Sequence, residues 1–554
     1  MTTQTASTPI YRQLAQAFHD EGVRRLFALT GDGNMHWEAS FSALDGVESI
    51  HVRHEHCAVA MATAYAALSG TVGVASVTCG PGVTQIVTAL ATAVEAHIPL
   101  VVFAGESPMH GRWYNQAIAQ APVVEASGAR YIACHSSRQL MFDVSRAFVM
   151  ARRERRPVVI GVPMDLQQEA VALPAYQPSG TLLPALSPIL PHPQDVAEAA
   201  ERIARASRIV VLAGRGAADA GAARAAMALA DLVDGALSAT LPVRGLFAGH
   251  ARYVGLAGGF AHQATRALFA EADLVIAVGT SLSSHTSDGN TLFTPAEVIQ
   301  IDLDPQPIKH GQRPAEMMVR ADAQAALEAI AAALAGRDRP ASGWSVADYA
   351  RRLAEEPIDD EADIDEPGIL DPRAVMRVLD ETLPADWTCV NSAGHCSYYA
   401  AHLTRNHARD FLVIREFGVI GNGLSYALGA AAARPDRPVV LFEGDGGLMM
   451  HIQELETVRR SGAKVLLCIF NDGAYGSEIH KLRADGLSDA GAVYGRTDLG
   501  AIARGFGLDG ERVTDLGQLP RLIERFEAGQ QSMLLDIQIS DKIMSPRMRK
   551  MTRR

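Results

Sequence analysis

Residues 439–475 read VVLFEGDGGLMMHIQELETVRRSGAKVLLCIFNDGAY and contain two apolar runs that each end in a polar, glycine-containing segment. The first run, 439–442, breaks at the GDGG of 444–447, where glycine permits a tight turn and a close backbone approach. Apolar residues at near-helical spacing follow, and 465–470 is a second run of the buried type. The pattern predicts strand, helix and strand, which together form one parallel βαβ unit.

The two polar segments supply oxygen donors at the same edge of the predicted sheet. Asp445 and Asn471 would both emerge at the carboxyl ends of parallel strands, where open α/β sheets bind ligands. A carboxylate, an amide oxygen and the loop carbonyl of Gly473 suit Mg²⁺ that already holds a diphosphate. The amides of three glycines would cradle the phosphate oxygens; these are Gly444, Gly446 and Gly447. Either segment alone is typical of an ordinary turn, but their pairing after consecutive buried strands is more specific.

The order GDG, a helix with Glu454-Leu455 near its start, and a strand that ends in asparagine resembles the cofactor motif of thiamine diphosphate (ThDP) enzymes. In that family the aspartate, the asparagine and a backbone carbonyl two residues later hold the metal. The resemblance therefore implies Asp445, Asn471 and Gly473 as metal ligands and Mg²⁺ as the metal.

Composition narrows the class of protein. With 554 residues the chain is too long for one core, and three domains are expected. A net charge of −12 argues against nucleic acid as a partner. The six cysteines show no disulfide-rich or CxxC spacing and are expected to be reduced. We find neither a leader pattern nor an apolar run of membrane-spanning length, so the sequence predicts a soluble cytoplasmic protein with no membrane partner.

Alternating strand and helix patterns predict an α/β protein with three Rossmann-like parallel-sheet domains. Proline-rich residues 173–193 and the acidic stretch within 336–372 read as linkers. The order resembles that of the acetolactate synthase, pyruvate decarboxylase and benzaldehyde lyase group over nearly the whole chain. It implies a pyrimidine-binding domain at 1–172, a central domain at 195–336 and a diphosphate-binding domain at 371–540.

Glu55 is the candidate for activation of the cofactor. In the family, a carboxylate at the pyrimidine ring nitrogen switches the aminopyrimidine into its imino form, and this glutamate lies in an RHE segment after a strand of the first domain. Here Arg53-His54-Glu55 precedes an alanine-rich predicted helix. The alternative is that Glu55 only stabilises the helix N-terminus.

Further cofactor contacts are implied by resemblance at Gly80, Pro81, Gly82, His395 and Ile420. The glycine-proline-glycine segment corresponds to a loop against the pyrimidine, although Gln85 stands where the family commonly has asparagine. Ile420 would be the bulky wedge between the two cofactor rings, or else a plain core residue. His395 would donate to the diphosphate, or else be a polar loop residue.

The substrate pocket has mixed signals. Asp32 matches an element of pyruvate decarboxylase-like members, in which the aspartate assists proton transfer, but residues 108–120 lack the histidine pair of those members. Gln116 instead resembles the lyase and synthase branches, where a glutamine faces the reacting carbonyl. Glu478 and His480 are expected to project toward the cofactor, or else to be polar surface residues. Burial by the cofactor would raise a carboxyl pKa and let Glu478 or Asp32 act as an acid.

The central domain carries weaker signals. Gly214-Arg215-Gly216 is a common α/β turn pattern, and Asp302 and Asp304 resemble a nucleotide-facing loop of the family. Residues 279–285 lack the arginine and paired aspartates associated with FAD-binding synthases. FAD is therefore possible but not favoured.

The leading hypothesis is a ThDP- and Mg²⁺-dependent enzyme that decarboxylates a 2-oxo acid and either protonates the product or couples it to an aldehyde or ketone, with acetolactate synthase-like carboligation favoured. Alternatives within the fold are a 2-hydroxy ketone or 2-hydroxyacyl-CoA lyase and a simple 2-oxo acid decarboxylase. A nucleotide-binding oxidoreductase is disfavoured because the GRG segment lacks a third glycine in register. A catalytically silent regulatory homologue is disfavoured by the intact Glu55. The resemblance also implies a homodimer or homotetramer with active sites between chains.

Overall fold

The computed structural model describes residues 8–184, 187–304, 313–359, 361–364, 366–403 and 410–552. Residues 1–7, which carry most of the N-terminal segment searched for a leader, lie outside this part, as do 185–186, 360 and 365 of the two predicted linkers. The chain forms two compact units. The first contains 1–185, 365–397 and 414–542, and the second contains 186–364, 398–413 and 543–554.

The first sheet is parallel and has the strand order β2-β1-β3-β4-β6-β5. Its strands are β1 (Arg25–Ala28), β2 (Glu48–His51), β3 (Gly73–Val77), β4 (Leu100–Glu106), β5 (Arg130–Ala133) and β6 (Pro157–Pro163). The helices of this region are α1 (Ile10–Asp20), α2 (Met35–Ser42), α3 (Glu55–Ser69), α4 (Pro81–Gln85), α5 (Val87–Glu95), α6 (Gln120–Ala126), α7 (Leu140–Glu154), α8 (Met164–Gln168) and α9 (Ser179–Leu182).

The second sheet is also parallel, with the order β12-β11-β10-β7-β8-β9. Its strands are β7 (Ile209–Ala213), β8 (Ala236–Ala239), β9 (Tyr253–Leu256), β10 (Leu274–Val278), β11 (Glu297–Asp302) and β12 (Met317–Arg320). The helices of this unit are α10 (Pro193–Arg205), α11 (Arg215–Asp219), η1 (Leu241–Val243), α12 (Ala223–Leu232), η2 (Gly258–Phe260), α13 (Gln263–Glu271), α14 (Ala323–Leu334), α15 (Val346–Glu355) and α24 (Pro546–Thr552).

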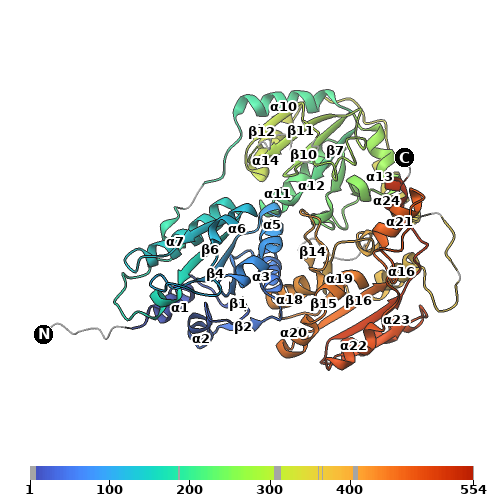
Figure 1. Cartoon of the computed structure of the whole chain (residues 1–554). Helices are drawn as coiled ribbons and strands as arrows, with labels where there is room; N and C mark the ends of the chain where they lie inside the picture. The colour runs from blue at the N-terminus through green and yellow to red at the C-terminus, as the bar shows by residue number, and fades with distance from the viewer. Residues whose placement is uncertain are drawn as a thin grey trace. The chain divides into compact units, whose positions relative to one another are not determined.

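The third sheet has the order β14-β13-β15-β16-β18-β17. Its strands are β13 (Thr388–Asn391), β14 (Phe411–Val413), β15 (Val439–Gly444), β16 (Val465–Asn471), β17 (Asp509–Val513) and β18 (Met533–Gln538). The helices of this region are α16 (Pro372–Thr382), α17 (Cys396–Ala400), α18 (Gly423–Ala433), α19 (Asp445–Met450), α20 (Glu454–Ser461), α21 (Gly476–Ala484), α22 (Leu499–Gly505) and α23 (Gln518–Ala528). The three sheets with their helices are seen in Figure 1, and the predicted α/β class with three Rossmann-like domains is confirmed.

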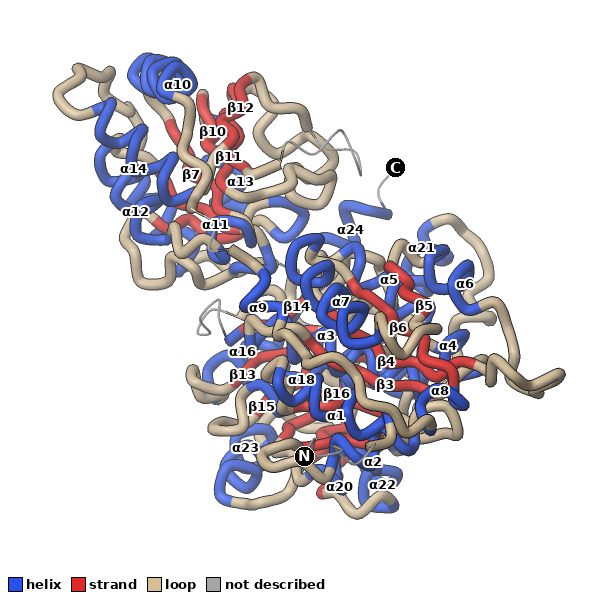
Figure 2. Tube along the Cα trace, turned by 90° about the vertical axis from the view of Figure 1, so that its left-hand side faces the viewer, coloured by secondary structure: helices blue, strands red, loops and turns tan. Residues whose placement is uncertain are grey.

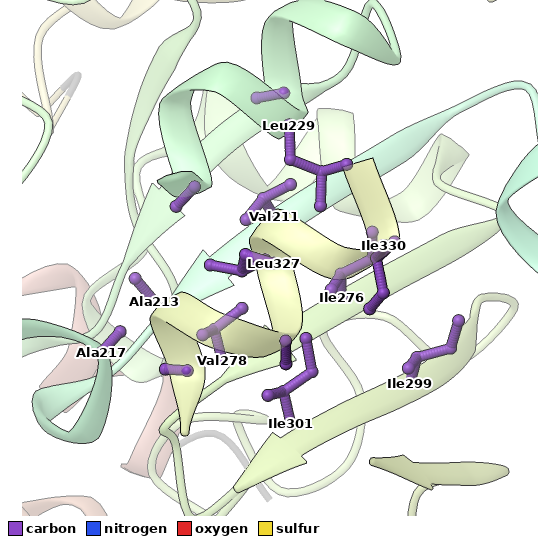
Figure 3. Close-up of a cluster of buried hydrophobic side chains, with 14 of the residues drawn as sticks. Val211, Ala213, Ala217, Leu229, Ile276, Val278, Ile299, Ile301, Leu327 and Ile330 are labelled. Atoms are coloured by element: carbon purple, nitrogen blue, oxygen red, sulfur yellow. The ribbon is translucent and has the colours of Figure 1, made fainter. Parts of the chain in front are cut away.

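The apolar runs become central strands because both faces of each sheet are covered by helices, which favours continuous rather than alternating apolar residues. In the second unit, side chains of β7, β10 and β11 pack against Leu229 of α12 and against Leu327 and Ile330 of α14 (Figure 3). These side chains are fully buried. Burial of one such side chain contributes roughly 1.5–3 kcal/mol, so this packing is sufficient to hold the helices on the sheet.

The prediction of a glycine turn at 444–447 is wrong. Strand β15 passes directly into α19, with Gly444 as the N-cap at φ −85° and Asp445 as the first helical residue. The glycines serve the predicted close approach instead, because a Cβ on Gly446 would lie 2.6 Å from the Tyr494 hydroxyl. The apolar run that follows forms two helices, α19 and α20, rather than one. Gly462 ends α20 in the left-handed conformation, which glycine adopts readily.

The segment at Gly80-Pro81-Gly82 is likewise not a loop throughout. Gly80, at φ 59° and ψ −105°, precedes α4, and Pro81 occupies the first position of that helix. Proline suits this position because the amide it lacks would have no partner inside the helix.

Two expectations from composition can be compared with the structure. All six cysteines are free and buried, as predicted. Among the residues that the structure describes, no helix combines the length and the apolar character needed to cross a membrane.

Candidate active site

Asn471 ends β16 at the carboxyl edge of the third sheet, and its amide is held in one orientation. Its Nδ2 donates to the Thr497 carbonyl at 3.0 Å and to Oδ1 of Asp536 at 2.7 Å. This arrangement directs Oδ1 away from both partners, and Oδ1 is buried with no hydrogen-bond partner among the residues that the structure describes. A buried acceptor of this kind is costly unless a ligand satisfies it. The orphaned oxygen therefore fits the predicted metal ligand.

Asp445 directly follows β15, the strand beside β16. It lies near Asn471 because Gly444, the last residue of β15, pairs with Phe470 of β16. Its Oδ2 accepts the Gly473 amide at 3.0 Å. Burial raises the pKa of Asp445, and burial together with the charge of Asp445 raises the pKa of Asp472. A cation between these groups would favour their ionised forms.

Gly473 has φ 73°, which only glycine adopts readily. Its carbonyl oxygen accepts the amides of Tyr494 at 3.0 Å and Gly495 at 2.9 Å. Both lone pairs are thus engaged, and this oxygen could join a metal only after one of these bonds is released. Within the described residues, no group of three or more His, Cys, Asp and Glu side chains could hold a metal, so a site here depends on mixed donors.

The glycines of α19 keep the space beside these donors narrow and free of side chains. A Cβ on Gly447 would lie 2.9 Å from Oε1 of Glu443, and one on Gly444 would lie 3.6 Å from the Cys396 sulfur. Asp445 and Gly446 form the first turn of α19, whose amides face outward along the helix axis. A helix N-terminus of this kind favours phosphate oxygens.

His395 and His480 lie together beside this edge. Their ring centroids are 4.7 Å apart, and both residues are buried. A Cβ on Gly476 would lie 2.5 Å from Oδ2 of Asp472 and 3.3 Å from Nδ1 of His395, which connects the pair to the Asp445 region. Burial, with a smaller contribution from His480, lowers the pKa of His395, so its imidazole is neutral at pH 7.

Glu478 is not brought into this cluster. It lies in the first turn of α21, its side chain is 54% exposed, and it pairs with Lys481 at 3.4 Å. In the single chain, Glu478 is therefore a surface residue, as the alternative interpretation expected.

The first sheet presents a second polar edge. Tyr114 hydroxyl lies 3.4 Å from Oδ2 of Asp32 and 3.4 Å from Oε1 of Gln116, and the Cys79 thiol donates to the same Gln116 oxygen at 3.2 Å. Asp32 is exposed and Gln116 is half-buried. Two residues predicted from different branches of the family thus lie within reach of one tyrosine. The sequence analysis did not single out Tyr114.

Gln120 is a further residue that the sequence analysis missed. Its buried side chain accepts the Gly80 amide at 2.8 Å and donates to the Gly105 carbonyl at 3.0 Å. A Cβ on Gly80 would lie 2.1 Å from the Gln116 carbonyl oxygen, so glycine is required there, and Gly82 approaches Thr78 closely. Gln120 fixes the backbone before α4, and no local motif marks it because its partners are distant in the sequence.

Glu55 is the first residue of α3 and is half-buried. The side-chain cap of this helix is His54, whose Nδ1 accepts the His56 amide at 3.1 Å. Glu55 is therefore not the capping side chain, although its place in the first turn of α3 still allows its charge to stabilise the helix N-terminus. Ile420 is half-buried in the irregular segment between β14 and α18, between glycines with positive φ at 418 and 421.

Glu443 is a buried carboxyl that sequence reasoning also missed. Its Oε1 accepts the Ser392 hydroxyl at 2.9 Å and the Gly423 amide at 3.2 Å, while Oε2 has no hydrogen-bond partner within the described part of the chain. Burial raises its pKa to about 7. A charged residue inside the apolar β15 was the available signal, because a buried carboxyl is rarely placed in a strand without a partner.

In the second unit, the GRG segment has a packing role. A Cβ on Gly214 would lie 2.4 Å from the Gly279 carbonyl, and one on Gly216 would lie 2.8 Å from the Gly279 Cα. These glycines allow two loops at the end of the sheet to touch. Asp302 ends β11 and Asp304 follows it, just ahead of residues outside the described part.

Comparison with known proteins gives a consistent family. Residues 10–123 match the N-terminal TPP binding domain of thiamine pyrophosphate enzymes, 196–330 the central domain and 392–537 the C-terminal TPP binding domain. Each match overlaps a different one of the three sheets, in the order that the sequence predicted.

Whole-length relatives agree. The chain is 30% identical to an acetolactate synthase large subunit of Parasynechococcus marenigrum, with 92% of this chain and 84% of the relative covered. It is 27% identical to a probable acetolactate synthase large subunit of Methanocaldococcus jannaschii, with 95% and 91% covered. It is 28% identical to a probable 2-ketoarginine decarboxylase of Pseudomonas aeruginosa, with 94% and 91% covered. The chain belongs to the thiamine diphosphate-dependent enzymes of the acetolactate synthase-like group.

Proposed function

We propose that this enzyme uses ThDP and Mg²⁺ to decarboxylate a 2-oxo acid and to couple the product to an aldehyde or ketone. The observation that carries the proposal is the buried, unpaired Oδ1 of Asn471 beside Asp445 at the carboxyl edge of the third sheet. When bound, ThDP would supply a nucleophilic carbon for the substrate carbonyl and a cationic thiazolium ring that can take up the electron pair left when CO₂ departs.

The chain's residues have separate roles in this proposal. Asp445 and Asn471 would hold the metal, and the Gly473 carbonyl, which accepts the amides of Tyr494 and Gly495 in this structure, would be the third protein ligand. The amides at the start of α19 bind phosphate oxygens, and neutral His395 donates to the same group.

On the pyrimidine side, Glu55 would hold a proton at the ring nitrogen, and the fixed backbone at Gly80 would contact the ring. The Gly80 amide already donates to Gln120, so it would not donate to the cofactor. The contact with the ring would instead be a van der Waals contact with this backbone and with the start of α4. Ile420 would separate the two rings. His480 would support His395, whose ring it touches.

Gln116 favours coupling over simple decarboxylation. Among the residues that the structure describes, both hydrogen bonds of the Gln116 side chain are accepted by Oε1, which leaves Nε2 to donate to a substrate carbonyl without giving up a proton. Asp32 is the observation that favours the second candidate, a 2-oxo acid decarboxylase, because its exposed carboxyl lies beside Tyr114 and could deliver a proton. Lyase activity toward 2-hydroxy ketones or 2-hydroxyacyl-CoA would use the same residues in the reverse direction.

We also propose that a second copy of the chain completes each site. Exposed apolar side chains lie near residues of both polar edges in the sequence: Trp113 and Ile118 flank Gln116 and are 81% and 47% exposed, and Met449 and Met450 follow Asp445 in α19 and are 42% and 47% exposed. Tyr494, whose hydroxyl approaches Gly446, is 47% exposed. Large exposed apolar patches mark interaction surfaces. A homodimer or homotetramer would bury them and would also cover Glu478.

FAD is not part of the proposal. The glycines of the GRG segment are explained by their contact with Gly279, and residues 279–285 lack the charged pattern associated with FAD-binding synthases.

The test is incubation of the purified full-length chain with ThDP, Mg²⁺ and a panel of 2-oxo acids and aldehydes, with products identified by mass spectrometry. We expect 2-hydroxy ketones to exceed free aldehyde when acceptor is in excess, and we expect EDTA to abolish turnover. Release of aldehyde alone would support the decarboxylase, and no turnover of any 2-oxo acid would contradict the proposal.

A further inference from the structure

The Asn471 side chain contacts a buried carboxyl group on the next strand of the third sheet. Strand β16 lies between β15 and β18, and β15 and β16 can be followed side by side in Figures 1 and 2. Asn471 ends β16, Asp536 lies within β18, and both residues are fully buried. The Asn471 Nδ2 donates to Oδ1 of Asp536 at 2.7 Å, so this contact is made away from solvent.

The partners of Asn471 decide which way its amide group is turned. The oxygen and nitrogen of an asparagine side chain are similar in size, so packing alone would accept either of two orientations. The Asp536 carboxylate and the Thr497 carbonyl can only accept hydrogen bonds, which requires that Nδ2 faces them. The Asn471 Oδ1 must then face away from both.

Asp536 is itself held as an acceptor by other donors. Its Oδ1 also accepts Nε2 of Gln538 at 2.9 Å, and its Oδ2 accepts the Leu499 amide at 3.2 Å. The Oε1 of Gln538 accepts from Arg512 at 3.2 Å, and arginine can only donate. Burial raises the pKa of Asp536, and the hydrogen bonds from Asn471 and Leu499 oppose this rise. Every group that faces this carboxyl group is thus a donor, which favours its ionised form.

We propose that Asp536 is a positioning residue that turns the Asn471 amide so that Oδ1, and not Nδ2, is presented to the divalent metal. The inference rests on the proposed function, in which Asn471 is a metal ligand. An amide nitrogen in that place would offer its hydrogens rather than a lone pair, so the affinity for the metal would fall. Asn471 and Asp536 belong to the same sheet of the same chain, so their contact needs no second copy of the protein.

The substitution Asp536→Asn keeps the size of the side chain and removes one of its two acceptors. The remaining oxygen can serve the Leu499 amide or the Asn471 amide, but not both. If it serves Leu499, the new side-chain nitrogen faces Asn471, which can then turn and accept through Oδ1. The orientation that suits a metal is therefore no longer imposed.

Asn471→Asp supplies the background that separates orientation from packing. A carboxylate presents an oxygen whichever way it turns, so Asp536→Asn should have little effect on metal binding beside it. Asp371→Asn is the matched control, because it makes the same change at another buried carboxyl group of the same unit, one that pairs with Arg373 at 2.6 Å. If Asp536→Asn does not fold, Asp536→Ser takes its place, because a hydroxyl both donates and accepts and so imposes no orientation.

The experiment measures the binding of Mn²⁺, as a substitute for Mg²⁺, in the presence of ThDP, on the full-length chain. Electron paramagnetic resonance reports the free Mn²⁺, and thermal unfolding without metal confirms that each variant is folded. We expect Asp536→Asn to weaken Mn²⁺ binding about tenfold, because loss of a group that orients a metal ligand costs on the order of 10- to 100-fold in affinity. In the Asn471→Asp background the same change should cost less than about threefold, and Asp371→Asn should match the parent.

A parent chain that does not bind Mn²⁺ in the presence of ThDP would overturn the proposed function and this inference together. If the parent binds Mn²⁺ and the folded Asp536→Asn variant binds it as tightly, the inference alone is wrong. Equal losses in the two backgrounds would also overturn it, because Asp536 would then affect packing at this edge rather than the orientation of Asn471.

Discussion

The first and third sheets have the same strand order, yet their carboxyl edges are built for different tasks. In each, the order along the sheet is second, first, third, fourth, sixth and fifth strand. In the third sheet the fourth strand, β16, ends at Asn471 with an unpaired buried oxygen. In the first sheet the fourth strand, β4, ends at Glu106, whose carboxylate is bound by Tyr131 and His135 of the same chain.

The difference teaches where each sheet can bind. At the third sheet, the buried Asn471 oxygen has no protein partner in the described part of the chain and is stabilised only if a ligand binds it. A metal ion that carries a diphosphate suits this oxygen. At the first sheet, the polar groups satisfy one another, so the edge offers a fixed surface and a few outward groups such as Asp32 and Gln116. A shared topology therefore supplies the position of the sites, while the strand-end residues decide their chemistry.

The largest effect should follow from removing the carboxylate of the third sheet. Asp445→Ala should abolish stabilisation by ThDP and Mg²⁺, because a metal with one protein ligand fewer no longer holds the diphosphate. At a concentration one hundred times the parent dissociation constant, the expected loss is about 2.7 kcal/mol of ligand-dependent stability. Thermal unfolding with and without cofactor measures it.

The equivalent strand end of the first sheet provides the control for this comparison. Glu106→Gln removes a carboxylate that is satisfied within the chain, and it should leave the increment produced by ThDP and Mg²⁺ close to that of the parent. If Asp445→Ala binds ThDP as tightly as the parent by calorimetry, the assignment of the third sheet is wrong.

The next largest effect should come from Glu55→Gln. The amide keeps the shape of the side chain but cannot hold a proton at the pyrimidine nitrogen, so ThDP should bind while exchange of its C2 proton slows about 10²- to 10⁴-fold. NMR of the bound cofactor gives the exchange rate, and calorimetry gives the affinity. An unchanged exchange rate would leave Glu55 as a residue that only favours the helix N-terminus.

The sequence was sufficient to predict the α/β architecture and the adjacency of two polar residues at the edge of the third sheet. Apolar runs flanked by glycine predicted the strands, and the GDG and NDG segments placed Asp445 and Asn471 side by side, because parallel strands end at the same edge. The start of α19 was not predicted, since glycine signals a turn by local propensity. In the structure, Tyr494 and Glu443 approach this helix so closely that they leave no room for a Cβ at 446 and 447, and glycine is kept there for that reason.

The first-sheet edge was less predictable for a physical reason. Gln120 contacts Gly80 and Tyr114 contacts Asp32, and partners this distant in sequence leave no periodic or spacing signal. The engagement of the Gly473 carbonyl by Tyr494 and Gly495 was equally invisible, because it depends on a loop that returns from later in the chain. The duplicated strand order also has no trace in sequence, since it is a property of pairing.

A smaller effect should appear in the pH dependence of stability. It should arise at His56 of α3, whose ring stacks on that of His451, between α19 and α20. Lowering the folded pKa of His56 from 6.5 to about 4 means that the unfolded chain binds more protons between these values. Stability should therefore rise with pH across this window and be lost as pH falls through it, with a slope of at most about 1.4 kcal/mol per pH unit. Denaturant unfolding at several pH values measures the slope.

The double variant His56→Gln, His451→Asn isolates this contribution from that of other groups. Buried carboxyls such as Glu454, whose pKa burial raises, contribute with the opposite sign in the parent and in the variant alike. The slope between pH 4 and 6.5 should be flatter in the variant. Parallel slopes would show that the two imidazoles do not limit stability in acid.

The smallest effect concerns how the first-sheet edge divides product between two fates. A decarboxylase protonates its product quickly, whereas a carboligase keeps proton donors away so that a second carbonyl can compete. Asp32 and Gln116 represent these two demands, and the Tyr114 hydroxyl lies 3.4 Å from an oxygen of each. Because Gln116 accepts through Oε1, its Nε2 can orient the acceptor carbonyl without delivering a proton.

We expect Gln116→Ala to lower 2-hydroxy ketone formation several-fold while CO₂ release changes less, which corresponds to about 1 kcal/mol for one neutral hydrogen bond. Asp32→Asn is the opposing variant and should reduce aldehyde release while coupling is retained. The ratio of ketone to aldehyde at fixed CO₂, measured with excess acceptor, decides between them. If Gln116→Ala leaves that ratio unchanged while Asp32→Asn abolishes all aldehyde release, the edge works as a decarboxylase site, and the carboligase proposal should be replaced by that reading.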